Sequence, residues 1–297
     1  MARTNAISLL AGSSTPATLS EVYGLVVENV QKGALSTALK SNQYSGNPAA
    51  GSVEFQRFTN SASKDYGTAR AAGKGDKVTA RPVTVNLSVH KEIVEEVAKF
   101  DIDTFGVADI MRRRADNHTI SMISDLDSAF FAKAATAGTA FTPASGVTTI
   151  QSILESMIQT LETVKNDYTD GVNRNLMDLV LSPARYGEIR TFLDTQSNPN
   201  VDTAGEEFGI YHGVRIYSCT RLPITTETVE ETKTKTTITD GILMVRGAVA
   251  QPVVTYPYGD PEKIPLSNDM AVSLFYDYGT EALTPDLIFK WQTSTTV

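Results

Sequence analysis

The sequence feature that most constrains the fold is a pair of strand-like segments separated by a long glycine-rich stretch. Residues 52–58 (SVEFQRF) alternate imperfectly, whereas every second residue from Val83 to Leu87 in residues 77–87 (KVTARPVTVNL) is apolar, as in a half-buried strand. The intervening stretch contains Gly67, Gly73, Gly75 and Asp76. Pro82 has no backbone N–H to donate, which indicates an edge strand. An isolated two-stranded ribbon is marginal in water, so we expect a long hairpin that lies on another surface.

The same hairpin is basic within an acidic chain. The formal net charge of the chain is −8, but residues 51–90 contain six basic and three acidic residues, a surplus of +3 that leaves −11 for the rest. The six basic residues are Arg57, Lys64, Arg70, Lys74, Lys77 and Arg81. A basic arm on an acidic body favours docking onto a neighbouring copy, so we expect these six residues at intersubunit contacts. A solvated hairpin with ordinary surface charges is the alternative.

The middle of the chain carries two helical patterns. Residues 103–137 place apolar side chains at near-helical spacing, Asp103 or Thr104 can cap the start, and Gly138 follows the end. Residues 148–164 (TTIQSILESMIQTLETV) form a stronger amphipathic stripe behind a threonine cap. The sequence therefore predicts one long helix ending near Gly138 and a second, shorter helix that covers a core.

Three consecutive arginines, Arg112, Arg113 and Arg114, lie within the first of these helices. Successive residues of a helix point in different directions, so the three present positive charge on more than one face. Such a cluster can bind a phosphate or a carboxylate. A solvated cluster, or one paired across a subunit contact, is the expected interpretation.

The second half of the chain reads as a mixed α/β layer. A buried strand is expected over residues 176–181, and Pro183 suits the first position of the short helix that follows. Strands are also expected in GIYHGVRIYSC and GILMVRGAVA, and a polar hairpin or loop in TTETVEETKTKTTITD. Two strands, residues 270–278 and 287–291, close the chain. Strands followed by helices and further strands are typical of a sheet with helices on its face.

Recognisable catalytic and metal-binding motifs are absent from the sequence. The histidines, His90, His118 and His212, lack the spacing and companion carboxylates of a metal site, and neither a Walker loop nor a G-x-S-x-G motif occurs. The single cysteine, Cys219, excludes an intrachain disulfide and is expected as a small buried side chain. His212 and Cys219 could form a thiol and base pair, but no orienting side chain is identifiable. We expect no enzyme, cofactor or metal.

Hydropathy and charge limit the partners of the chain. No segment approaches the roughly 20 apolar residues of a membrane span, and a net charge of −8 argues against a dedicated nucleic-acid binder. We expect a soluble cytoplasmic chain that neither crosses a membrane nor recognises a nucleic-acid sequence.

Taken in order, these segments resemble parts of one family. The hairpin with DYGTAR and GKGD, and the helix ending in DLDSAFFAKAA, are similar to the extended loop and spine helix of tailed-phage major capsid proteins of the Hong Kong 97 fold. Further on, LVLSPARYGEIR resembles the central strand and helix of that family, FGIYHGVRIYSCTRLP its next strand, and GILMVRGAVAQPV the strand that returns to the peripheral domain. The resemblance covers nearly the whole chain.

The resemblance implies an α+β architecture with named parts. It implies an N-terminal arm (residues 1–50), an extended β-hairpin loop (51–90), a peripheral domain with a long spine helix (91–146), a central or axial α/β domain (147–250) and return strands of the peripheral domain (251–297). The extended loop of this family reaches over an adjacent subunit. Glycines at its tip allow different shapes at differently curved positions of a shell.

The implied function is that of a bacteriophage major capsid protein. Hexamers and pentamers would assemble in the host cytoplasm into an icosahedral shell of the virion, which encloses double-stranded DNA without sequence-specific binding. A portal and a separate scaffolding protein are expected partners, because no fused scaffolding region precedes the arm, unless the chain is already trimmed. Some family members crosslink a loop lysine to an asparagine of a neighbour. No motif identifies such a partner for Lys64, Lys74 or Lys77.

Three alternative functions remain open from the sequence. An encapsulin-like nanocompartment shell would have the same fold and carry an enzyme cargo in place of a genome. A soluble oligomeric α/β enzyme would show turnover or a bound cofactor. A tail-tube or other virion protein would form rings or tubes instead of closed shells.

Overall fold

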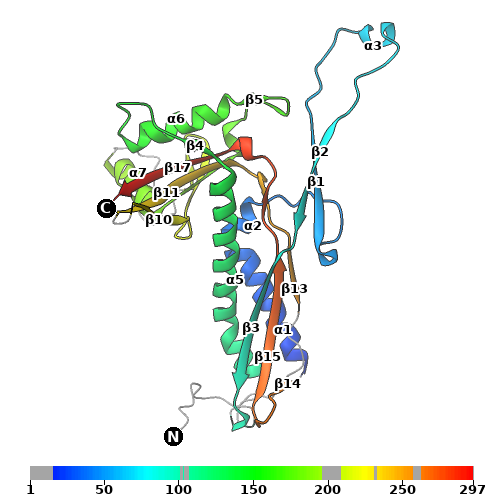
Figure 1. Cartoon of the computed structure of the whole chain (residues 1–297), viewed down its shortest axis with the longest axis vertical. Coiled ribbons are helices and arrows are strands. Elements are labelled where there is room, and N and C mark those ends of the chain that lie inside the picture. Colours follow the sequence, from blue (N-terminus) through cyan, green and yellow to red (C-terminus); the bar gives the residue numbers. More distant parts are fainter. Residues whose placement is uncertain are drawn as a thin grey trace.

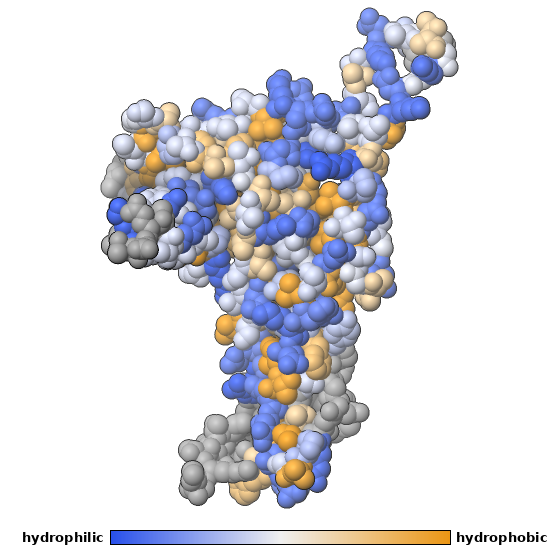
Figure 2. Space-filling view, in the orientation of Figure 1, coloured by the Kyte–Doolittle hydropathy of each residue, from blue (hydrophilic) through white to orange (hydrophobic). Residues whose placement is uncertain are grey.

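The protein consists of a helix-covered sheet, a long stalk and a projecting hairpin (Figure 1). The structure is a computed structural model that describes residues 16–100, 103, 107–195, 209–230, 233–256 and 262–296. The tip of the hairpin stands clear of the body on a narrow neck (Figure 2). Within the described residues, no helix is long and apolar enough to cross a membrane.

A seven-stranded mixed sheet forms the central domain. Its strand order is β4 (Thr139–Phe141), β17 (Ile288–Thr296), β11 (Lys233–Val245), β7 (Met177–Leu181), β9 (Val214–Ser218) and β8 (Ile210–Tyr211), with β10 (Ile224–Glu230) also paired to β11. The β7–β9 and β17–β4 pairs are parallel and the others antiparallel. The polar segment before residue 241 thus forms a hairpin, as expected.

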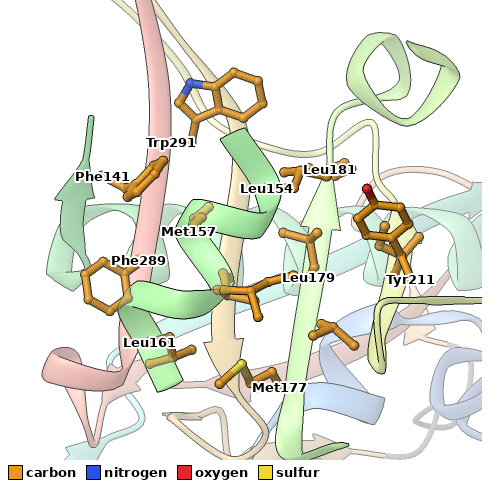
Figure 3. Packing of buried hydrophobic residues seen from close by; sticks show 14 of the residues in the cluster. Phe141, Leu154, Met157, Leu161, Met177, Leu179, Leu181, Tyr211, Phe289 and Trp291 are labelled. Atoms are coloured by element: carbon orange, nitrogen blue, oxygen red, sulfur yellow. The ribbon is translucent and has the colours of Figure 1, made fainter. Parts of the chain in front are cut away.

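Helices α6 (Ile150–Glu162) and α7 (Pro183–Thr195) pack against this sheet. The apolar stripe of α6, including Leu154, Met157 and Leu161, points at side chains of β7 and β17 (Figure 3). All three are fully buried. Thr149 occupies the N-cap position of α6 and Pro183 is the first residue of α7, so the predicted starts of both helices are confirmed.

A 31-residue helix, α5 (Val107–Ala137), forms the stalk. At 1.5 Å per residue it is about 46 Å long. It ends just before Gly138, as predicted, and carries Phe130 and Phe131 into a core shared with β7, β11 and β17. Asp103 belongs to a helical turn, whereas Thr104, the alternative cap, lies outside the described residues.

The lower half of α5 supports a second sheet, and we use the term peripheral domain for these elements together. Strand β15 (Met270–Tyr278) pairs along its whole length with β3 (Val89–Val97), and also with β13 (Val253–Tyr256) and β14 (Glu262–Lys263). Leu274 and Tyr276 of β15 are buried beside Met122 of α5. The hydroxyl of Tyr276 donates to Asp125 on α5 (2.6 Å), and burial followed by this hydrogen bond raises the pKa of Tyr276.

The described part of the expected N-terminal arm is helical. Helix α1 (Pro16–Gly33) packs along α5, because Val26 and Val30, four residues apart, bury one face of α1 against it. Helix α2 (Leu35–Leu39) follows. Its N-cap residue has no capping side chain, and Asp127 of α5 instead accepts from the backbone N–H of Ser36 (2.9 Å). These residues are part of the stalk core, which differs from a free arm.

The closing strands divide between the two sheets. Strand β15 lies in the peripheral sheet, but β17 lies in the central sheet between β4 and β11. Residues 251–297 are therefore not all return strands of the peripheral domain. The reason is that the alternating residues of β17, Phe289 and Trp291, fill the core beneath α6. The smaller elements are η1 (Pro48–Ala50), β5 (Lys165–Asn166), β6 (Thr169–Asp170), η2 (Arg174–Leu176), β12 (Val249–Ala250), β16 (Glu281–Ala282) and η3 (Pro285–Leu287).

Candidate assembly interface

The projecting hairpin consists of β1 (Ser52–Phe58) and β2 (Ala80–Asn86), which pair antiparallel from Ser52 opposite Asn86 to Phe58 opposite Ala80. The predicted hairpin is confirmed, and within its two-stranded sheet β2 pairs with β1 alone, so Pro82 lies in an edge strand.

The base of the hairpin is fixed by apolar packing. Val53, Phe55 and Val85 point to one face of the ribbon and are buried against Ala250 and Leu283. The alternation of apolar residues in the sequence therefore marks the side on which the ribbon meets the body. This packing sets the direction in which the hairpin leaves the molecule.

A polar clamp reinforces that base. The guanidinium of Arg57 donates two hydrogen bonds to the carboxylate of Asp286 (2.6 and 2.8 Å) and lies 4.2 Å from the centroid of the Tyr168 ring. Asn166 also donates to Asp286 (2.6 Å). Burial alone would raise the pKa of Asp286, but the hydrogen bonds from Arg57 and Asn166 outweigh it and hold this pKa below its usual range. A paired, ionised clamp thus joins the hairpin to the central domain.

Beyond the clamp, the tip of the hairpin has little support from the body. Residues 60–68 and 71–80 are exposed, and Tyr66 and Val78 expose 95% and 79% of their surface. Across the tip, Lys64 pairs with Asp76 (2.6 Å), and the turn around helix α3 (Thr68–Ala71) uses Gly67 at φ 94°. Apart from the adjoining residues of the chain, no described atom lies within 4 Å of where a Cβ at Gly67 would be. Glycine is therefore needed at this position for its backbone angle and not for lack of space.

The six basic residues predicted to make intersubunit contacts do not form one cluster. Arg57 and Lys64 have partners within the chain, and the side chain of Arg70 lies outside the described residues. Lys74, Lys77 and Arg81 are exposed and have no ion-pair partner among the residues that the structure describes. Their charge is available to another molecule. Arg81 also borders an open hollow of about 640 Å³ at the base of the hairpin.

The three consecutive arginines all lie in α5, and the structure describes the side chain of the last of them. Arg114 donates to Glu95 of β3 through Nε (2.8 Å) and forms an ion pair with it through Nη2 (2.7 Å), and the buried His118 lies 3.3 Å from the same carboxylate oxygen. The side chains of Arg112 and Arg113 lie outside the described residues. Arg114 therefore joins the stalk helix to the peripheral sheet.

The remaining residues considered for catalysis or metal binding are buried or held in ion pairs. Cys219 is buried, as predicted, and this burial raises the pKa of its thiol. His90 pairs with Asp277 (2.7 Å) and His212 with Glu155 (2.6 Å), each in a different part of the chain. The described residues contain no group of three or more His, Cys, Asp or Glu side chains placed to hold a metal ion.

Sequence reasoning missed the partners of these residues. Asn166 and Tyr168 come from the β5–β6 hairpin and Asp286 from η3, which the fold brings to the base of the projecting hairpin; Asp286 lies 229 positions from Arg57. No local pattern could have indicated them. Glu95 lies in β3, a strand that the sequence analysis did not predict, so its contact with Arg114 was missed as well.

Comparison with known proteins identifies the family. A family model described as phage capsid protein matches residues 91–290. No curated protein matches the chain. Among solved structures, the chain resembles one from Mycobacterium phage Che8, with 17% identity and a TM-score of 0.54, covering 98% of this chain and 96% of that chain.

Two further solved structures are similar in fold to this chain. The capsid structure of cyanophage P-SCSP1u has 12% identity and a TM-score of 0.59, covering 98% of this chain and 92% of that chain. A virus-like particle from Pyrococcus furiosus has 12% identity and a TM-score of 0.52, covering 92% of this chain and 98% of that chain. The chain therefore belongs to the phage capsid protein family and has the Hong Kong 97 fold of tailed-phage major capsid proteins.

Proposed function

We propose that this major capsid protein assembles as hexamers and pentamers into a closed icosahedral shell around a double-stranded DNA genome. The observation that carries the proposal is the family match over residues 91–290. The shape supports it, because a hairpin that extends from the body with an exposed tip suits contact with another subunit. Its role is structural, and we propose no catalytic step.

The shell would be held together by repetition of weak contacts. Head-to-tail contacts form rings, and symmetric contacts between rings close the surface. Each contact need not be strong, because simultaneous engagement of many copies raises the overall affinity. An acidic chain of net charge −8 would hold DNA without binding its phosphates tightly. A separate scaffolding protein and a portal complete the proposed set of partners, and assembly takes place in the host cytoplasm.

The extended loop would supply one of the contacts within a ring. The clamp of Arg57 with Asp286 fixes the direction of the loop, while Lys74 and Lys77 at the exposed tip meet carboxylates of the adjacent subunit. Charge complementarity of this kind steers subunits together and fixes their register.

Reversal of the tip charge tests this contact. Lys74→Glu with Lys77→Glu is expected to reduce the fraction of protein sedimenting as closed shells, with the secondary structure of the subunit unchanged by circular dichroism. The matched control, Lys74→Arg with Lys77→Arg, keeps both charges and is expected to assemble normally. A normal shell yield from the glutamate variant would contradict the proposed loop contact.

An enzyme-carrying nanocompartment is the second candidate function. It is favoured by the similarity in fold to the Pyrococcus furiosus virus-like particle. Particles from the native source would distinguish the two, because packaged double-stranded DNA supports the phage shell and a protein cargo without a genome contradicts it.

A further inference from the structure

We draw no further inference here: the strongest candidate, the open hollow of about 640 Å³ at the base of the projecting hairpin, belongs to the assembly interface already described, and its lining, which includes Arg57, Arg81 and Asp286, carries charges of both signs that do not single out one class of ligand.

Discussion

The central domain and the extended loop both contain apolar side chains, but the two regions differ in where these side chains are buried. In the central domain, apolar side chains from α6, β7 and β17 pack against one another. Helix α6, which had the stronger amphipathic pattern in the sequence, covers a core that is complete within the subunit. In the loop, an equally clear alternation buries side chains only at the base, while Tyr66 and Val78 at the tip are left to solvent. A domain core stabilises the subunit, whereas we propose that the loop is completed by assembly.

A matched pair of phenylalanines gives the largest test of this difference. Phe130 is fully buried where α5 meets the central sheet, whereas Phe58 at the loop base is 58% exposed. Phe130→Ala is expected to lower the free energy of unfolding by about 4 kcal/mol, through lost transfer energy and a cavity. Phe58→Ala should lower it by less than about 1 kcal/mol. Denaturant unfolding measures both, and equal losses would contradict the division into core and loop.

The clamp at the loop base should show an intermediate effect. Arg57 and Asp286 have side chains that are 17% and 30% exposed and share two hydrogen bonds, so Arg57→Met is expected to cost about 2 kcal/mol of unfolding free energy. Lys64→Met removes the exposed pair with Asp76 at the tip and should cost under about 0.5 kcal/mol.

Limited proteolysis adds a readout for the loop itself. With Arg57 replaced, cleavage between residues 59 and 79 is expected to accelerate, because the hairpin loses its tie to the central domain. Unchanged cleavage in Arg57→Met, or a larger effect of Lys64→Met on stability, would show that the base is not what holds the loop.

The same comparison explains which parts of the structure the sequence could predict. The hairpin, the end of α5 at Ala137 and the buried strand β7 are local patterns of alternation, spacing and turn residues, and each is confirmed. The placement of β17 in the central sheet depends on pairing with β11 and β4, distant in sequence. Helix α1 was missed, because its two valines indicate a helix only when the stalk they contact is known. Local patterns predict elements, but not their partners.

The candidate interface divides in the same way. Basic residues of the loop could be named from the sequence, since a charge surplus is a local property. The contacts that these residues make could not be predicted, because Arg57 meets Asp286 only through the packing of the hairpin on the body.

The last prediction is a pH dependence confined to the central domain. Glu155 on α6 accepts from Arg174 (2.7 Å) and then from His212 (2.6 Å), and these hydrogen bonds lower its pKa to about 2. Because the pKa is lower in the folded than in the unfolded chain, the stabilisation is complete above the ordinary pKa of 4.5 and lost as the pH falls toward 2. Glu155→Gln should therefore cost about 1 kcal/mol near neutral pH, a value reduced by solvent screening. The difference from the wild type should vanish toward pH 2 in denaturant unfolding, and a difference independent of pH would show that packing, not charge, holds α6 to the β8–β9 turn.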